Sequence, residues 1–513
     1  MKSFTRIKKI HGLDYLYEIT PYYDPETKKI KQRSRYLGKN INGTPVKVFS
    51  QGVIPKKILS YGEFVLLNKI VEDLNLEQIL YGLLSEKETW SILTVAFNHL
   101  VHPRAMAQIQ SWYEGTSLSN QHPNLPLSSQ SLSNLLASIG NRGMHLDLSK
   151  KLIENQSTSS TLIYDITSLS SYSEKISLLE FGYSRDNPDL PQINLSLIVD
   201  QVRGIPVMYD LYPGSIVDVS TLKNTIQKLH AIGIPGHTLI LDRGFFSTSN
   251  IEELTSNKLS FIIAASNTLK SVKQAISNVH GVIDDPNYLR IYEKEPLFVM
   301  PVQIEIGGRL VNGYAYYDQN REQRERNSFY KRLNETVEKL QKIDLKPWMN
   351  PYEVFKEVAR RNQKYICWTV VDQKFDVSIK KNAVSQQVNR MGKMVLLYEG
   401  IFSWDQCLSL YKSRDAVEKG FSLMKNDLEV MPLNVKKEST LKGYLLVCFI
   451  ALLISMRLSK MMSEANLVKK YSIDGIFTEL EKIKLIVMPD ERKIVSEITK
   501  RQKDILNALG LCA

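Results

Sequence analysis

The chain has 513 residues, of which 43% are hydrophobic and 23% are charged, and its formal net charge is +12. This length predicts about two to four domains, and this composition excludes a largely disordered chain. The surplus of Lys and Arg favours a polyanionic partner, because a protein that neutralises phosphates releases condensed counterions.

Cysteine and histidine usage and the apolar runs exclude further classes of protein. His99 and His102 are interpreted as helix-end residues because no Cys or carboxylate partners lie nearby. The apolar run 445–456 is shorter than the about 20 residues that span a bilayer, which predicts a buried core helix. No apolar run follows the basic start, which predicts no signal peptide. No C-x-x-C pair occurs among Cys367, Cys407, Cys448 and Cys512, which argues against a zinc site and a disulfide framework and fits a reducing cytosol. Together with the apolar runs, this predicts a cytoplasmic protein with no membrane contact.

Residues 1–50 are predicted to form a basic β-hairpin. The alternating stretches LDYLYEITPYY and IKQRSRYLG flank the polar turn DPETKK and place Lys and Arg on an exposed face. Residues 51–157 have a helical pattern, since Phe64, Leu67 and Val71 recur at three to four residues. These segments together form either a DNA-end-binding module or a packing and dimerisation domain.

Residues 158–265 alternate between strands and helices and predict one mixed sheet. An antiparallel meander of three strands comes before two β-α-β steps, so helices pack on the sheet. This order places the first and fourth strands side by side, each ending in an Asp. The strands are expected over 160–168, 193–201, 204–213, 237–244 and 261–265, with helices ending near 231 and covering 247–256.

The alternation breaks after residue 265. The chain is then predicted to contain a β-rich insertion with a highly charged helix, a return to the sheet domain through a long helix and an apolar helix, and a helical C-terminal region. The fold class is therefore mixed α/β. The corresponding ranges are 266–400 with the charged helix at about 319–342, 401–460 with helices at about 404–429 and 441–458, and 461–513.

Asp165 and Asp242, at the ends of the first and fourth strands, are candidate metal ligands. Both side chains project into one crevice of such a sheet, where ligands collect. Two carboxylates that close repel each other unless a cation lies between them, and hard oxygen ligands suit Mg²⁺ or Mn²⁺. Two such ions activate a water and stabilise the leaving oxygen in phosphodiester cleavage.

The long helix supplies a third acid. Tyr411, Arg414, Glu418 and Lys425 point within roughly 60° of one another on an ideal helix. Glu418 is therefore a candidate third metal ligand, with Arg414 and Lys425 on either side to grip phosphates. Taken singly, a strand-end Asp is commonly a turn residue, and such a helix face is commonly solvated. The conjunction of all three acids favours the metal site.

These residues resemble the DDE transposases of bacterial insertion sequences that carry a Y-(2)-R-(3)-E-(6)-K motif. Here the motif comprises Tyr411, Arg414, Glu418 and Lys425, while YDITS contains Asp165 and LDRGF contains Asp242. The stretch GIPVMYDLYPGSIVDVSTL between the two Asp motifs is also similar. The resemblance covers about 160 to 458. One departure is that Lys442 or Gly443 stands where related proteins often have a His.

The resemblance implies a ribonuclease-H-like core, a five-stranded mixed sheet interrupted by the insertion. It implies metal-dependent nicking at the ends of an element, with Asp165, Asp242 and Glu418 as catalytic and metal-binding residues. Transfer of the freed 3′-OH into target DNA then follows. Arg414 and Lys425 hold terminal phosphates beside Tyr411. Trp348 or Trp368 either stacks on a flipped base or belongs to the core.

The implied partners are double-stranded DNA, as terminal inverted repeats and target, and a second copy of the chain in a synaptic homodimer. The implied location is the cytoplasm of a bacterium, at the nucleoid. Two other hypotheses remain. A ribonuclease-H-like nuclease has the same acids but leaves only cleaved ends. A domesticated DNA-binding protein is expected to have lost an acid, and this sequence keeps all three.

Overall fold

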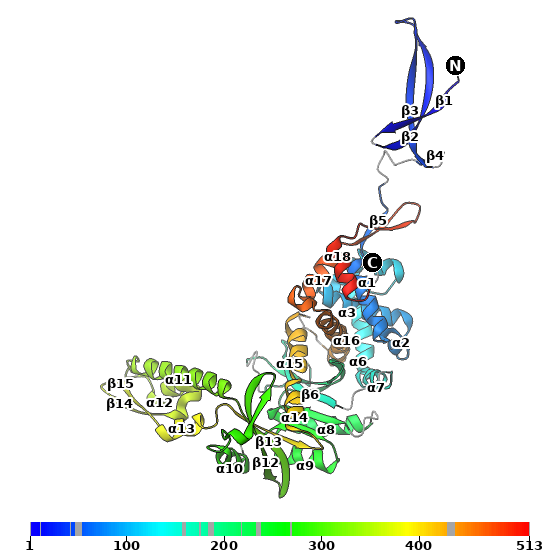
Figure 1. Ribbon diagram of the computed structural model, residues 1–513. Coiled ribbons are helices and arrows are strands. Elements are labelled where there is room, and N and C mark those ends of the chain that lie inside the picture. Colours follow the sequence, from blue (N-terminus) through cyan, green and yellow to red (C-terminus); the bar gives the residue numbers. More distant parts are fainter. Residues whose placement is uncertain are drawn as a thin grey trace.

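The computed structural model describes the chain except for residues 1, 11, 42, 47–53, 156–160, 174–175, 183–188, 217, 232–236, 267–268, 428–434, 436 and 512–513. Figure 1 shows four parts along the molecule: a small N-terminal sheet, a helical region that also contains the C-terminal segment, a large sheet with helices, and a lobe beside that sheet. Cys367, Cys407 and Cys448 are free thiols, and Cys512 lies outside the described residues.

The N-terminal segment forms a four-stranded antiparallel sheet, which stands apart from the other parts in Figure 1. The predicted hairpin is confirmed, because Asp24 pairs with Lys29 across the DPETKK turn. Two further strands that were not predicted flank it. The order is β1-β2-β3-β4, with β1 (Phe4–Ile10), β2 (Leu13–Asp24), β3 (Lys29–Ile41) and β4 (Thr44–Val46).

The helical pattern predicted after residue 60 is confirmed by α1 to α7. Ser85 begins α3 with a capping box to Glu88, which satisfies two free N–H groups at the helix start. The elements are β5 (Lys57–Ser60), α1 (Gly62–Asp73), α2 (Leu76–Tyr81), α3 (Glu86–Val101), η1 (Met106–Gln108), α4 (Ile109–Glu114), α5 (Leu118–Gln121), α6 (Ser129–Asn141) and α7 (Met144–Asn155).

The C-terminal segment packs on this helical region, and it is not wholly helical as predicted. Two short strands were missed. Strand β17 pairs with β18 and also with β5, more than 400 residues earlier in the chain, where Leu485 pairs with Leu59. The elements are η6 (Leu467–Lys469), α17 (Ile473–Leu480), β17 (Lys484–Val487), β18 (Lys493–Val495) and α18 (Lys500–Ala508).

The apolar helix α16 (Glu438–Glu464) joins the helical region to the large sheet. Among the described helices it alone is long and apolar enough to cross a membrane, but 78% of its most apolar stretch is buried inside the protein, as the prediction of a core helix requires. It crosses α6 closely, because a Cβ on Gly443 would lie 2.0 Å from the Leu136 carbonyl oxygen. Lys442 pairs with Glu438 at 2.8 Å. Gly443 and Lys442 therefore serve helix packing and an ion pair, respectively.

The large sheet contains the five predicted strands in the order β10-β9-β6-β7-β8. Strand β6 is antiparallel to β7 and parallel to β9, so the predicted pairing of the first and fourth strands is confirmed. Because β7 is buried along its whole length, both sheet faces are covered. The elements are β6 (Thr161–Ser170), β7 (Gln192–Asp200), β8 (Ile205–Pro213), α8 (Asp218–Ala231), β9 (Thr238–Leu241), η2 (Arg243–Phe245), α9 (Thr248–Ser256) and β10 (Phe261–Ala264).

The segment after β10 continues this sheet to nine strands, in the order β11-β12-β13-β16 and then β10. The prediction of five strands counted only those before residue 265. The extension follows from β16, which returns to pair with β10 at Ala264 and Leu396. The elements are α10 (Lys270–Val279), η3 (Pro286–Tyr288), β11 (Leu289–Tyr292), β12 (Glu295–Ile306), β13 (Arg309–Tyr317) and β16 (Lys393–Glu399).

Between β13 and β16 the chain forms the lobe, which lies beside the sheet in Figure 1 and is mostly helical. It has a core of its own around Phe329, Leu340 and Phe355. The chain leaves the sheet at Asp318 and re-enters it at Gly392, where the Asp318 N–H donates to the Gly392 carbonyl at 2.9 Å. The elements are α11 (Gln319–Gln341), α12 (Pro351–Ala359), η4 (Arg360–Tyr365), β14 (Ile366–Val371), β15 (Lys374–Ile379) and α13 (Lys381–Val388).

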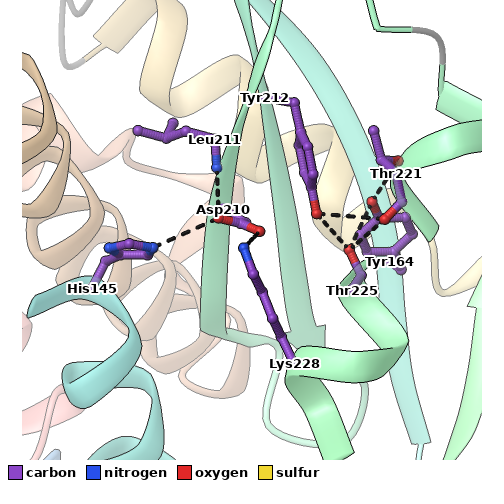
Figure 2. Close-up of polar contacts among 8 residues, drawn as sticks. All are labelled: His145, Tyr164, Asp210, Leu211, Tyr212, Thr221, Thr225 and Lys228. Atoms are coloured by element: carbon purple, nitrogen blue, oxygen red, sulfur yellow. Dashed lines mark hydrogen bonds and ion pairs between the residues drawn. The ribbon is translucent and has the colours of Figure 1, made fainter. Parts of the chain in front are cut away.

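A buried polar network clamps β8, at the edge of the sheet, to two helices (Figure 2). The Asp210 carboxylate lies between Lys228 of α8 and His145 of α7, with the His145 Nε2 at 3.6 Å. On the same side of the sheet as α8, the buried Tyr164 hydroxyl donates to Thr221 at 2.8 Å. These contacts fix β6 and β8 against α8. Since strand side chains alternate, the residue after Tyr164 faces the opposite side.

Glu63, in the first turn of α1, is 1% exposed, and its Oε2 has no hydrogen-bond partner in the described part of the chain. Burial raises the pKa of this carboxyl to about 7 from the ordinary 4.5. The folded state therefore binds more protons than the unfolded state between these two values. The contribution of Glu63 to the free energy of unfolding is therefore greatest below about pH 4.5, and it is lost as the pH rises through about 7.

We expect Glu63→Gln to unfold at nearly the wild-type temperature at pH 4.5, and to be more stable by about 3 kcal/mol at pH 8. The reason is that the amide never carries the buried charge. Thermal unfolding of both proteins across this pH range measures the difference. Glu72→Gln, on the exposed face of the same helix, is the control and should show no such divergence. A Glu63→Gln effect that is equal at both pH values would contradict the prediction.

Candidate active site

Asp165 and Asp242 come together because β6 and β9 are parallel neighbours. Tyr164 pairs with Leu241, so the next residue on each strand is one of the two acids. Strand β9 ends there, but β6 runs on to Ser170 because β7 continues to pair with it. The prediction that the first strand ends in an acid is therefore wrong. Asp165 lies in mid-strand, at the point where β6 loses its neighbour on one side.

The third acid, Glu418, lies on a helix that is not continuous as predicted. The chain forms α14 (Trp404–Lys412), α15 (Asp415–Ser422) and the π-helical turn η5 (Leu423–Asp427). At the break the Ser413 hydroxyl donates to the Leu410 carbonyl at 2.6 Å, and the Arg414 N–H donates to Tyr411 in a tighter turn. Such local serine hydrogen bonds compete with the helix ladder and bend it.

Gly420 allows α15 to lie close against the sheet. A Cβ at this position would lie 3.0 Å from the Met456 sulfur of α16 and 3.6 Å from a Leu197 methyl of β7. The neighbouring Val417 and Phe421 are buried in the core that the helical region shares with this face of the sheet. The buried side of α15 therefore sets the height of Glu418 above the two strand acids.

The guanidinium of Arg414 lies among the three carboxylates. Its Nη1 is 3.0 Å from Asp242 Oδ1 and 3.8 Å from Asp165 Oδ2. Its Nη2 is 2.9 Å from Glu418 Oε1. The acids from β6, the end of β9 and α15 thus converge on one cationic centre. The Tyr411 hydroxyl adds a hydrogen bond of 3.3 Å to Asp242 Oδ1, beneath the same guanidinium.

The electrostatics of the site are dominated by burial. Burial raises the pKa of the Asp165 carboxyl to about 7, and the negative charges of Asp242 and Glu418 act in the same direction. The Ile166 N–H, which donates to Asp165 Oδ1 at 2.8 Å, and the Arg414 guanidinium oppose this rise. Burial disfavours the charge on Arg414, but Asp242 and its other partners outweigh it and raise the pKa of the guanidinium. Negative charge therefore exceeds positive charge at this point.

The donor set fits a divalent cation in its chemistry, since three carboxylates supply hard oxygen ligands. In this structure, however, the three carboxylates are spaced around the guanidinium of Arg414 and not around a metal-sized centre. Among the described residues, no group of three or more His, Cys, Asp or Glu side chains is arranged to hold a metal ion. A cation that binds all three acids therefore requires Arg414 to leave its present position.

Of the remaining predicted site residues, Lys425 lies beyond α15, and Trp348 and Trp368 lie in the lobe. Lys425 is partly buried in the turn η5, beyond α15. Trp348, between α11 and α12, is 79% exposed. Trp368 of β14 packs against Phe355 and Phe375 in the core of the lobe. Stacking on a flipped base stays a prediction for both tryptophans, and the exposed ring of Trp348 suits it better.

Arg243, which directly follows Asp242 and is exposed, was not predicted as a site residue. Its place inside the LDRGF motif, next to Asp242, could have indicated from the sequence that it lies near the site. Arg414 was predicted to bind phosphates, whereas in this structure it contacts the acids. Carboxylates this close to one another are stabilised by a cation among them, and the guanidinium takes that place.

Residues 156–454, more than half of the chain, match the family model described as "Transposase DDE domain", and the chain belongs to this family. The protein is therefore a transposase, an enzyme that cleaves and transfers DNA. No curated protein matches the chain. It is similar to a chain in the cryo-EM structure of a piggyBac transposase synaptic complex with hairpin DNA, at 10% identity and a TM-score of 0.37, over 81% of this chain and 77% of that chain. That similarity is too low to add to the family assignment.

Arg414→Ala leaves three facing carboxylates without their shared counter-charge. We expect the metal-free protein to lose roughly 2 to 3 kcal/mol of unfolding free energy, less than for a fully buried pair because Glu418 is half exposed. Added Mg²⁺ should raise the stability of this variant more than that of the wild type. Thermal unfolding in EDTA and in MgCl₂ measures both effects.

Lys419→Ala is the matched control, because its pair with Asp415 is highly exposed and lies on the same helix. A change below about 0.5 kcal/mol is expected there. If Arg414→Ala and Lys419→Ala unfold at the same temperature in EDTA, the guanidinium does not hold the acids together.

Proposed function

We propose that this transposase mobilises an insertion sequence of the bacterial group with the Y-(2)-R-(3)-E-(6)-K motif, by binding its terminal inverted repeats, cleaving at its ends and joining the 3′-OH ends to target DNA. Asp165, Asp242 and Glu418 are the proposed catalytic residues. The observation that carries the proposal is the convergence of these three acids on the single cation of Arg414. A solvated helix face would not bring acids from three distant segments together.

The same three acids are the proposed ligands of Mg²⁺ or Mn²⁺, as two ions in each site. Such ions, when bound, activate the attacking oxygen and stabilise the leaving one. The role of Arg414 follows from its geometry. A DNA phosphate offers the guanidinium a bidentate partner, which draws it off the carboxylates and leaves them free for a cation. Lys425 and Tyr411 are proposed to contact neighbouring phosphates of the cleaved end.

The N-terminal sheet is proposed to bind the terminal repeats, with the helical region supporting it or mediating dimerisation. Cationic side chains lie over exposed or partly exposed rings on this sheet, with Lys8 4.7 Å from the centre of Tyr17 and Arg33 5.8 Å from that of Tyr22. Cations with aromatic rings suit DNA phosphates and bases. Joining two ends in one event requires both in a single complex, so a homodimer acting on DNA in the cytoplasm is proposed.

Asp165→Ala, Asp242→Ala and Glu418→Ala should each lower strand nicking by at least roughly a hundredfold, because each acid contributes several kcal/mol to the chemistry. Binding to the same DNA should remain within a few-fold of wild type. The measurement is nicking of a labelled duplex that carries the DNA flanking the gene, followed by a search for joined target molecules. Full activity in any one variant would remove that residue from the site.

Asp415→Ala is the control, an exposed acid on the same helix as Glu418, and it should cleave like wild type. The joined product separates the transposase from the competing nuclease. A wild-type protein that nicks these ends but never joins them to a target would support the nuclease and overturn the proposed insertion-sequence activity.

A further inference from the structure

A cleft of about 470 Å³ lies where the lobe meets the sheet, and its charge is strongly one-sided. We call it the basic cleft and define it by the six cations that line it, Arg243, Arg321, Arg324, Arg332, Arg390 and Lys393. Among the described residues that line it, the one acid is Glu325, which pairs with Arg321 at 2.8 Å and accepts the Gly392 N–H at 2.9 Å. One ion pair within the cleft leaves most of its positive charge without an acidic partner.

The cations of the basic cleft come from three separate segments. Arg321, Arg324 and Arg332 lie on α11, and Arg390 and Lys393 lie at the turn where the chain re-enters the sheet. Arg243 comes from the core, one residue after Asp242. Neither Arg243, Arg324 nor Arg390 has an ion pair with an acidic side chain within the described ranges. The basic cleft therefore opens beside the candidate active site and contains cations available to a ligand.

The arrangement of the α11 cations suits an extended polyanion. Arg321, Arg324, Ser328 and Arg332 all line the cleft and are spaced by three or four residues, so they share one helix face. The row extends over about 16 Å at about 1.5 Å per residue. A DNA strand carries one phosphate for about every 3.4 Å of duplex axis, so a row of this length can follow several phosphates. A single free phosphate reaches only a fraction of it.

A second cleft, which shares the first turns of α11 with the basic cleft, is different in charge. Arg321 and Arg324 line it too, but so do Glu293, Glu295 and Asp318. Its cation Lys412 is already paired with Glu293 at 3.2 Å. Such a mixed surface repels phosphates as much as it attracts them. Of the two clefts, the basic cleft is therefore the one that suits a negatively charged backbone.

We infer that the basic cleft holds the phosphate backbone of the duplex DNA that enters the active site, with Arg243 as the link between the cleft and the catalytic acids. The inference rests on the proposed function and extends it to a surface that the three acids do not define. It assigns the lobe a role in gripping DNA, through α11 and the turn at Arg390, rather than in chemistry.

The test compares two charge-matched double variants. Arg324→Gln with Arg390→Gln removes two cations of the basic cleft, and Lys331→Gln with Lys339→Gln removes two exposed cations of α11 that do not line it. Binding to a labelled 40-base-pair duplex of the DNA flanking the gene is measured by fluorescence anisotropy at several KCl concentrations, in EDTA so that no strand is cut. Thermal unfolding of both variants confirms that they fold.

The cleft variant should bind at least tenfold more weakly at 0.1 M KCl, and the slope of log K against log [KCl] should fall by about two, since each lost phosphate contact lowers it by about 0.9. The control variant should change the slope by less than half as much. Equal slopes in the two variants would overturn the inference, while wild-type nicking and the effects of the acid variants would leave the proposed function standing. No DNA binding by the wild type would overturn both.

Inorganic phosphate distinguishes a DNA track from a small-anion site. Isothermal titration of wild type with millimolar phosphate at constant ionic strength should show no saturable binding. Saturable phosphate binding that disappears in the cleft variant, together with an unchanged salt slope for DNA, would instead assign the cleft to a free anion and overturn the inference.

Discussion

Mutual repulsion among three carboxylates is the constraint on which the candidate active site of this protein depends. Asp165, Asp242 and Glu418 are brought to one point by the sheet and by α15, and burial makes the charge on Asp165 especially unfavourable. Arg414 offsets that repulsion from within. A cation at the centre stabilises this arrangement, so a ligand that draws the guanidinium away favours the entry of another cation in its place.

The scaffold that imposes this constraint is assembled from parts far apart in the chain. The parallel pairing of β6 with β9 aligns two acids, and the buried face of α15 is pressed onto β7 and α16 at Gly420. Helix α16 then ties the sheet to the helical region by a backbone-to-backbone crossing at Gly443. On the other face of β6, Tyr164 is held by the hydroxyls of α8. Each contact limits the freedom of the acids to move apart.

The lobe between β13 and β16 gives the protein a second cationic element beside the first. Arg414 is enclosed by acids, whereas the arginines of the basic cleft face open solvent with few acidic partners. On the inferred path, a DNA strand bound along α11 continues past Arg243 toward Arg414, since Arg243 lines the cleft and directly follows Asp242, which Arg414 contacts. DNA binding in the basic cleft and the movement of Arg414 away from the carboxylates are then coupled, because the same polyanion attracts both sets of cations.

The sequence by itself determined most of the local elements and pointed to the candidate site residues. The patterns of neighbouring residues predicted β6 to β10 and most of the helices, and the strand-end acids and the Tyr411 motif predicted Asp165, Asp242 and Glu418 as site residues. Only the tertiary structure decided what depends on distant partners: β6 runs past Asp165 because β7 pairs with it, and β17 pairs with β5 as well as with its neighbour β18. The extension of the sheet to nine strands and the position of Arg414 among the acids also depend on contacts between distant segments. Pairing energies and the choice of a counter-charge are set by which segments meet in space, and no local pattern encodes that.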